Sequence, residues 1–237
     1  MCAHARDSRF TPSNPYSMVA GVLRPILITF AIPHESSDLR ACLLGDQCQI
    51  MHTGIGLESA AARMKQAIDD RQPGMVISAG FAGGLDPRLG VAEPVADSTR
   101  SDARLLGDLP SGVRQGAFLS VASLLETVTA KSAAFRETGA LAVDMETSAI
   151  AEACSAAGIP ALFVRAISDA ATAEIPIPFS ASYDLARQRP RPFGVCVALL
   201  RSPSRIPRFV HFLRDLKAAR AALTRTVCEV LAGCAAP

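Results

Sequence analysis

The sequence has little charge, and its charge is not gathered into long runs. Only 19% of the 237 residues are charged, and 24 basic and 22 acidic side chains give a formal net charge of +2. This scatter argues against a nucleic-acid partner and against contact with an anionic membrane. A small-molecule substrate is the better expectation, and 49% hydrophobic residues are enough to build one large core.

The seven cysteines include no Cys-x-x-Cys pair. Their odd number, and the apolar surroundings of Cys42, Cys154 and Cys196, argue against a disulfide framework and against a zinc site. No metal is expected, and a reducing cytoplasm is the compartment that fits best.

The start of the chain lacks the features of a signal peptide or a membrane span. Residues 1–17 carry charges, two prolines and no apolar core. We expect a disordered leader there, followed by a single domain over residues 18–237.

Short apolar runs alternate with alanine-rich stretches of helical period. This alternation predicts an α/β fold in which helices cover a central sheet that is mixed and mostly parallel. Residues 97–111 and 172–192 do not follow the pattern and are expected to be loops. The expected strands lie near residues 25–31, 47–53, 75–80, 91–96, 112–119, 140–144 and 161–167, and the expected helices near residues 57–71, 122–136, 147–157 and 206–232.

Two of the expected strands end in acidic residues. Residues 140–146 read Ala-Leu-Ala-Val-Asp-Met-Glu, and residues 161–169 read Ala-Leu-Phe-Val-Arg-Ala-Ile-Ser-Asp. Open α/β sheets form their ligand crevices at the carboxyl ends of strands. The placement of these acids therefore predicts a binding site at that edge of the sheet.

Two glycine-rich turns follow strands, but neither fits a dinucleotide fingerprint. The turn Thr53-Gly-Ile-Gly56 opens a helix, so its backbone N–H groups could receive an anion or a sugar hydroxyl. Ser59 stands where a nicotinamide site needs a third glycine, and Gly80-Phe-Ala-Gly-Gly84 has the wrong spacing. No cofactor is expected, and tight packing of strand against helix is the alternative for both turns.

Five motifs follow one another along the chain, namely Ala31-Ile-Pro-His-Glu35, Thr53-Gly-Ile-Gly56, Ser78-Ala-Gly-Phe-Ala-Gly-Gly-Leu85, Val143-Asp-Met-Glu146 and Arg165-Ala-Ile-Ser-Asp169. In this order they resemble the nucleoside phosphorylase superfamily, in particular the methylthioadenosine/S-adenosylhomocysteine nucleosidases and the hopanoid-associated phosphorylases. The resemblance extends from residue 25 to the C-terminus and implies a three-layer α/β/α fold that commonly forms a homodimer. It also implies an enzyme that cleaves the N-glycosidic bond of a purine nucleoside.

The resemblance implies roles for three acids. Cleavage passes through an oxocarbenium-like sugar, so the leaving purine needs a proton and the cation needs a nearby carboxylate. Asp169, aimed by Ser168, would protonate the purine. Glu146, kept ionised, would hold the ribose hydroxyls, with Met145 packed on the sugar. Glu35 would orient the attacking water.

Further contacts to the substrate are expected around the nucleobase. Phe118 resembles the aromatic side chain that stacks on the purine, with an ordinary core phenylalanine as an equal alternative. The main chain of Leu119 would meet the edge of the base. The second glycine turn would contribute Phe81, Ala82 and Gly83, and Phe81 would narrow the site.

Two neighbouring charged residues have other expected roles. Arg165 lies on an apolar strand and is expected to form a structural ion pair with Asp144 or Glu146. His34 is a second candidate for the base, beside Glu35.

Water is favoured over phosphate as the nucleophile. A phosphate site needs several converging cations or N–H donors, and the Gly-Asp-Pro-x-Arg motif of the hexameric phosphorylases is absent from the first loop. Arg63 is a possible phosphate ligand, so phosphorolysis is the first alternative. A non-catalytic nucleoside-binding protein is the second, because residues 97–116 are shorter than in the nucleosidases.

The segment 206–232 is expected to form a basic amphipathic helix packed on the sheet. A helix on a membrane surface is the less favoured alternative. Together with the sequence around Glu146, this helix points to the hopanoid-associated branch and to substrates with a bulky apolar 5′ group.

Overall fold

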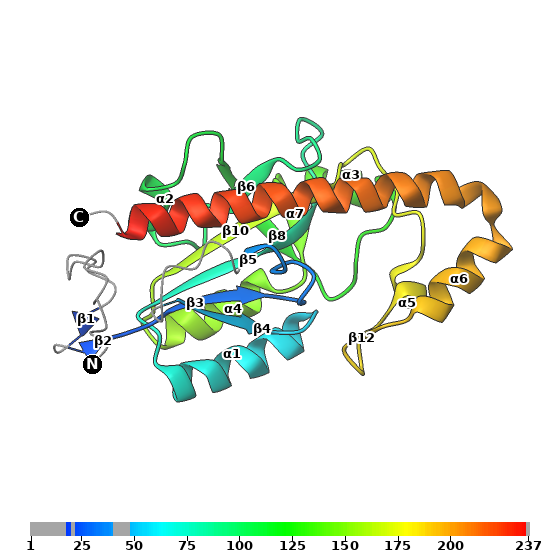
Figure 1. The fold of residues 1–237 in the computed structure, drawn as a ribbon. Helices are drawn as coiled ribbons and strands as arrows, with labels where there is room; N and C mark the ends of the chain where they lie inside the picture. The colour runs from blue at the N-terminus through cyan, green and yellow to red at the C-terminus, as the bar shows by residue number, and fades with distance from the viewer. Residues whose placement is uncertain (1–17, 20–21, 40–47, 236–237) are drawn as a thin grey trace, which may run out of the picture.

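An eight-stranded sheet forms the centre of the computed structural model, which describes residues 18–19, 22–39 and 48–235 (Figure 1). Six strands form the main path of the sheet, and two more, β9 and β8, continue from β5. In spatial order the main path is β4 (Cys48–His52), β3 (Ile26–Phe30), β5 (Met75–Gly84), β10 (Ala161–Asp169), β6 (Pro94–Asp97) and β7 (Arg114–Gly116), and the continuation is β9 (Ala142–Asp144) and β8 (Phe118–Ser120).

The sheet is mixed and mostly parallel, as the sequence predicts. The pairs β3–β4, β3–β5, β5–β10, β6–β7 and β8–β9 are parallel, whereas β10–β6 and β5–β9 are antiparallel. Because β3, β5 and β10 run in the same direction, their carboxyl ends meet at one edge. The acidic residues that follow these strands are therefore brought to that edge.

Helices cover both faces of the sheet, which confirms the predicted fold class. The second half of α7 (Ile206–Ala235) packs on one face, where Leu223 and Val227 meet Ile28 and Val164. The opposite face packs against α1 (Leu57–Arg71) and α4 (Thr147–Ala156), with Met64, Ile150 and Phe163 in a second apolar cluster. The helix α3 (Val128–Thr138) packs its Phe135 near β9.

The predicted strands and helices are largely confirmed, but both segments expected to be loops contain helix. The helix α2 (Ala103–Gly107) lies within residues 97–111, and the Asp102 side chain caps it by accepting a hydrogen bond from the Arg104 N–H. The expected strand 112–119 is divided, because β7 pairs with β6 whereas β8 pairs with β9.

The second expected loop contains more regular structure than its prolines indicate. It holds α5 (Phe179–Ser182) and a short hairpin of β11 (Tyr183–Asp184) and β12 (Arg189–Pro190). The helix α6 (Pro192–Arg201) begins with a proline in its first turn, where the missing N–H costs no intrahelical hydrogen bond. A single 3₁₀ turn (Pro203–Arg205) then leads into α7.

One cysteine within the described residues is disulfide-bonded. Cys154 is a free, buried thiol and Cys196 a free, exposed one, whereas Cys228 is disulfide-bonded, which the sequence argument did not anticipate. The expected leader and Cys42 lie outside the described residues, as does the short stretch after Ala235. Within the described residues, no helix is both long enough and apolar enough to span a membrane. A two-stranded hairpin of β1 (Met18–Val19) and β2 (Val22–Leu23) precedes the sheet.

Candidate active site

Glu35 is held by three backbone N–H groups in the turn after β3. One carboxylate oxygen accepts hydrogen bonds from Ala31 (2.9 Å) and Ile32 (3.0 Å), and the other accepts one from Phe81 on β5 (2.9 Å). Burial raises the pKa of the Glu35 carboxyl above its usual value, while these hydrogen bonds and the charge of Arg165 oppose the rise. The turn thus fixes one acid beside the end of β5.

Glu146 is the N-cap residue of α4, but its side chain makes no capping hydrogen bond. The Asp144 carboxylate, two residues earlier, accepts hydrogen bonds from the backbone N–H and the hydroxyl of Thr147 in the first turn. The Glu146 carboxylate is directed instead to the Thr53–Gly56 turn, where it accepts a hydrogen bond of 2.8 Å from the Gly56 N–H. Glu146 is therefore available to face the edge of the sheet where Glu35 lies.

Burial opposes the ionised form of Glu146 that the resemblance implies. Burial, together with the negative charges of Asp144 and Glu35, raises the pKa of Glu146 to about 8, although the Gly56 N–H and Arg165 oppose this shift. The sequence argument placed an ionised carboxylate here. It could not weigh the cost of burying that charge beside two other acids.

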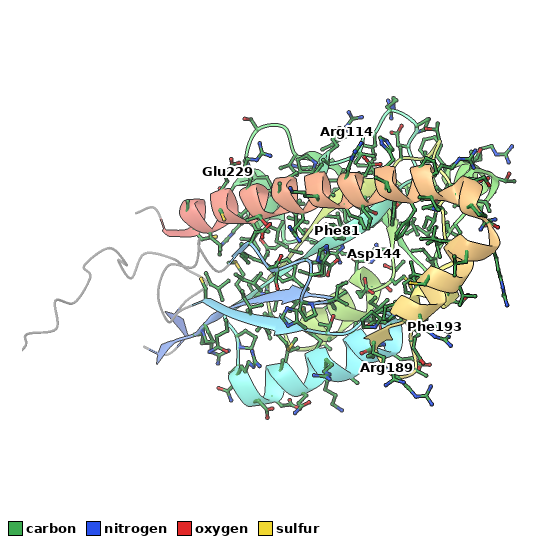
Figure 2. All side chains as sticks on the ribbon, turned by 45° about the vertical axis from the view of Figure 1, so that its right-hand side comes forward. Phe81, Arg114, Asp144, Arg189, Phe193 and Glu229 are labelled. Atoms are coloured by element: carbon green, nitrogen blue, oxygen red, sulfur yellow. The ribbon has the colours of Figure 1, made fainter. Side chains whose placement is uncertain are left out.

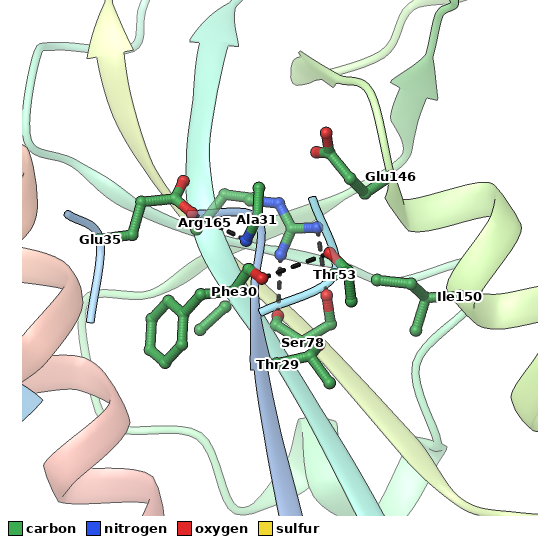
Figure 3. Close-up of a pocket in the computed structure, with 11 residues that line it drawn as sticks. Thr29, Phe30, Ala31, Glu35, Thr53, Ser78, Glu146, Ile150 and Arg165 are labelled. Carbon is green, nitrogen blue, oxygen red and sulfur yellow. Dashed lines mark hydrogen bonds between the residues drawn. The ribbon is translucent and has the colours of Figure 1, made fainter. Parts of the chain in front are cut away.

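Glu35 and Glu146 line one small cavity, and Figure 3 shows them on opposite sides of the Arg165 side chain. Its volume is about 10 Å³, close to the space that one water molecule needs. The remaining lining comes from β3, the end of β4, β5 and α4, namely Thr29, Phe30, Ala31, Thr53, Ser78, Ala79, Gly80 and Ile150.

Arg165 has the structural role that the sequence predicts. It is 2% exposed, and its guanidinium donates to Asp144 (2.8 Å), to the Ser78 carbonyl (2.8 Å) and to the Thr147 hydroxyl (2.8 Å). These partners tie β10 to β5 and to the start of α4 beneath the cavity. The predicted partner Asp144 is confirmed.

Asp169, at the end of β10, has two side-chain partners. One carboxylate oxygen accepts a hydrogen bond from the Ser168 hydroxyl (2.5 Å), and the other forms a salt bridge with Lys131 of α3. Lys131 has no exposed surface, and its ammonium also donates to the carbonyls of Ala170 (3.0 Å) and Ala173 (2.9 Å). Ser168 aims Asp169 as expected, and Lys131 adds a buried positive charge.

Glu35 and Asp169 both lie against β5, but Asp169 does not line the cavity that Glu35 shares with Glu146. Asp169 lines a second cavity of about 620 Å³ between α3, the segment 172–176 and α7. The Asp169 carboxylate lies beside Gly83, where an added Cβ would approach it to 3.2 Å, and that of Glu35 lies beside Gly80, at 3.0 Å.

Comparisons with known proteins identify the family of the chain. The sequence profile of the phosphorylase superfamily matches residues 99–200. A 5′-methylthioadenosine/S-adenosylhomocysteine nucleosidase of Staphylococcus aureus is 32% identical over 165 residues, which cover 56% of this chain and 72% of that relative. The chain belongs to the phosphorylase superfamily.

Solved structures show the same fold for this superfamily member. The structure of a 5′-methylthioadenosine/S-adenosylhomocysteine nucleosidase from Neisseria meningitidis, in complex with methylthio-immucillin-A, superposes with a TM-score of 0.64 at 19% identity. The superposition covers 88% of this chain and 99% of the other. A protein described as a 5′-methylthioadenosine/S-adenosylhomocysteine nucleosidase from Borrelia burgdorferi, bound to adenine, gives a TM-score of 0.65 at 19% identity, over 87% of this chain and 99% of the other.

The first glycine turn of this phosphorylase-superfamily chain is occupied by its own side chains. The Gly56 N–H is bonded to Glu146, and the Ile55 N–H donates to the Gln188 side chain (2.8 Å), whose amide returns a hydrogen bond to the Ile55 carbonyl (2.8 Å). Gly54 has a positive φ of 79°, which favours glycine. These N–H groups therefore orient protein groups rather than standing open to an anion.

Phe118 is an ordinary core residue in this structure. It is 3% exposed and packs in an apolar cluster with Leu141 and Ile167. The backbone of Leu119 lies in the parallel ladder of β8 with β9. Neither lines the cavity of Glu35 and Glu146 or that of Asp169.

The other expected substrate contacts lie close to the acids. Met145 is buried next to Glu146 in the chain. Phe81 is half-buried against the α7 side of the core, and its N–H holds Glu35. The Ala82 carbonyl accepts a hydrogen bond from Ser168 (3.2 Å), and Gly83 pairs with Asp169. In contrast, His34 is exposed and contacts Arg220 of α7, and Arg63 is exposed on α1.

Sequence analysis missed two residues that shape the site. Lys131 resembles a solvated helix lysine, yet it shares a helix face with Ala134 and Phe135, three and four positions later, and both pack on the core. That spacing was a signal that Lys131 faces inward. Gln188 gave no such signal, because its partner Ile55 is 133 residues away in the chain.

Proposed function

We propose that the protein is an N-ribosyl hydrolase that releases the base from a purine nucleoside with a 5′ substituent. The observation that carries this proposal is the pair of buried carboxyl groups, Glu35 and Glu146, around a cavity the size of one water molecule. The relationship to an S. aureus nucleosidase makes methylthioadenosine and S-adenosylhomocysteine the first substrates to test.

Each acid has a role that its surroundings support. Glu35 is fixed by three backbone N–H groups and is placed to accept a proton from a water that attacks the sugar. Glu146, once ionised, faces the positive charge that develops on the ribose. Substrate binding would favour that ionised form, because ribose hydroxyls are hydrogen-bond donors to a carboxylate.

Asp169 is the proposed route of the proton to the leaving purine. The Ser168 hydroxyl and the Lys131 ammonium hold its two oxygens in one orientation. Lys131 is itself a proton-bearing group, so the pair Asp169 and Lys131 together can hold the proton that the base takes up. Protonation makes the purine a better leaving group, which lowers the barrier to cleavage of the glycosidic bond.

Water is favoured over phosphate because the cations near Glu35 and Glu146 are already committed. Arg165 is the cation that lines their cavity, and Asp144, Ser78 and Thr147 occupy its guanidinium. Arg63 lies exposed on α1 and does not line this cavity. A phosphate needs several converging donors, and these are lacking among the described residues that line the cavity.

The decisive experiment is a base-release assay on the full-length protein. Methylthioadenosine and S-adenosylhomocysteine are incubated with and without inorganic phosphate, and free adenine is followed by chromatography. Adenine release that does not depend on phosphate supports hydrolysis, whereas phosphate-dependent release with formation of a sugar phosphate supports phosphorolysis. Tight nucleoside binding without any release would identify a non-catalytic binding protein.

Substitution of Asp169 tests the assignment of the acid. Asp169→Asn is expected to abolish measurable base release while nucleoside affinity stays within about tenfold, because the amide keeps the shape but cannot donate the same proton. Exposed Glu152 on α4 provides a matched control, and Glu152→Gln should leave turnover unchanged. Normal turnover in Asp169→Asn would remove Asp169 from the mechanism.

A further inference from the structure

One continuous segment of the chain concentrates positive charge. Residues 185–214, which we call the arginine-rich arm, contain seven arginines and no aspartate, glutamate or lysine. The whole chain has a formal net charge of +2, so the residues outside the arm together carry −5. The charge that looks scattered over the whole sequence is therefore strongly segregated.

The arm also exposes apolar side chains. None of the residues of α6 is buried, and Phe193 and Leu200 are each 79% exposed. Ile206, Val210 and Leu213 in the first turns of α7 are exposed by 44%, 42% and 48%. Large apolar side chains exposed together in this way mark an interaction surface.

Most of the arm lies beyond the end of the sheet, although Arg208 and Phe212 reach the cavity that Asp169 lines. Figure 1 shows α6 and the start of α7 projecting beyond the strands, and Figure 2 shows Phe193 and Arg189 at this end of the molecule. The buried residues of α7 begin only at Ala219. The sequence-based expectation of a helix packed on the sheet is thus correct for the second half of α7 and wrong for the first.

Helical spacing places the exposed apolar residues on shared faces. Phe193 and Leu200 are seven residues apart, close to two turns of α6. Ile206, Val210 and Leu213 follow the spacing of one face of α7. Arginines lie between and beside these faces, at positions 191, 201, 205, 208 and 214.

We propose that the arginine-rich arm docks on an anionic phospholipid surface. Such a surface offers what the arm lacks, a layer of negative headgroups above an apolar interior, so arginines and apolar side chains are satisfied together. Arginine side chains also keep an apolar stem under a charged head, which suits this boundary.

A second copy of the chain fits the arm less well. A two-fold interface would place the same patch, with its seven arginines, on both sides. The two acids that flank the arm already have partners within the chain, Asp184 with Arg187 (3.2 Å) and Asp215 with His211 (3.6 Å). Nucleic acid would match the positive charge of the arm. However, bases stack on aromatic side chains, and the exposed Leu200, Val210 and Leu213 are aliphatic.

The test is co-sedimentation of the full-length protein with lipid vesicles. We expect binding to vesicles of phosphatidylcholine with phosphatidylglycerol and none to phosphatidylcholine alone. Binding should fall at least tenfold when salt is raised to about 1 M, where charges are screened within about 3 Å.

Two arm variants and one control separate docking from a general charge effect. One variant combines Arg201→Glu, Arg205→Glu and Arg208→Glu, and the other combines Phe193→Ser and Leu200→Ser. Each variant should reduce vesicle binding at least tenfold. The control reverses three exposed charges outside the arm, Lys65→Glu, Arg71→Glu and Arg136→Glu, and should retain most of the binding. Circular dichroism checks that each variant is folded.

Three outcomes would overturn the proposal. One is the absence of wild-type binding to anionic vesicles, and another is equal loss of binding in the control and the arm variants. The third is an oligomer, seen by light scattering, that the arm variants dissociate, because this would make the arm a protein interface. None of these readouts depends on nucleoside cleavage, so the test is independent of the proposed enzymatic function.

Discussion

Among single residues, the salt bridge between Lys131 and Asp169 is expected to matter most for stability, because it places two opposite charges in the interior. The side chain of Lys131 has no exposed surface and that of Asp169 is 8% exposed. Each charge is costly to bury alone and tolerable only beside the other. The two residues are therefore expected to depend on each other for stability.

This dependence gives the first prediction. Lys131→Met should lower the free energy of unfolding by about 3–5 kcal/mol, because it leaves the Asp169 carboxylate buried without its partner. The double variant Lys131→Met with Asp169→Asn should lose much less, since no charge is then left unpaired. Urea unfolding of the two single variants and the double variant measures the coupling. Strictly additive losses would show that the pair is not coupled.

Glu146 provides the second prediction, on the pH dependence of catalysis. The raised pKa of about 8 means that most of the free protein holds this carboxyl neutral at pH 7. If the ionised form faces the developing cation, kcat/KM should rise with pH and level off above about 8, because kcat/KM reports ionisations of the free enzyme. The pH profile of adenine release measures this, and Glu146→Gln should lack the rise. A wild-type profile that falls between pH 6 and 8 would contradict the assignment.

At the scale of elements, the hairpin of β11 and β12 is anchored over the glycine turn by one side chain. Gln188 bonds both the N–H and the carbonyl of Ile55, and its own φ is 49°. The same turn bonds Glu146 through Gly56. The hairpin, the turn and one of the acids thus form a connected unit.

Removing this anchor gives the third prediction. Gln188→Ala should increase amide hydrogen exchange in residues 183–190 and at Ile55, because the hairpin loses both of its hydrogen bonds to the turn. Exchange in β5 and β10 should be unchanged. Hydrogen-exchange mass spectrometry makes the measurement, with the exposed Arg189→Ala as the control on the same hairpin. Unchanged exchange in Gln188→Ala would mean that the backbone alone holds the hairpin.

The elements also show which features can be predicted from sequence. Apolar periodicity located β3, β4, β10, α1 and α4 because each buries a regular face. Family motifs pointed to Glu35 and Asp169, which lie against β5, and to Glu146, which shares a cavity with Glu35. Contacts between distant segments left no periodic signal. The amide of Gln188 reaches Ile55, and the partner of Lys131 lies 38 residues away. Phe118 was ambiguous because a stacking ring and a core ring have the same sequence signature.

At the scale of the whole molecule, the parallel order of β3, β5 and β10 is what brings buried acids to one edge of the sheet. Glu35 follows β3, Asp169 ends β10, and both carboxylates lie against the end of β5. The fold must therefore supply enough stability to offset the burial of these polar groups. A molecule built in this way should be sensitive to pH in a defined direction.

The fourth prediction is that stability falls as pH rises. The carboxyl groups of Glu35 and Glu146 have raised pKa values in the folded protein, about 8 for Glu146, against a usual value of 4.5. Between these values the folded state keeps protons that the unfolded chain has lost. The contribution of these carboxyl groups to the free energy of unfolding is therefore complete when the pH is below their usual pKa. It is lost as the pH rises through their pKa in the folded protein. Glu146→Gln should lose less stability between about pH 5 and about pH 9 than the wild type, because its amide does not titrate. Urea unfolding at both pH values measures the difference, with exposed Glu152→Gln as the control. An equal loss in Glu146→Gln and the wild type would mean that Glu146 does not titrate in this range.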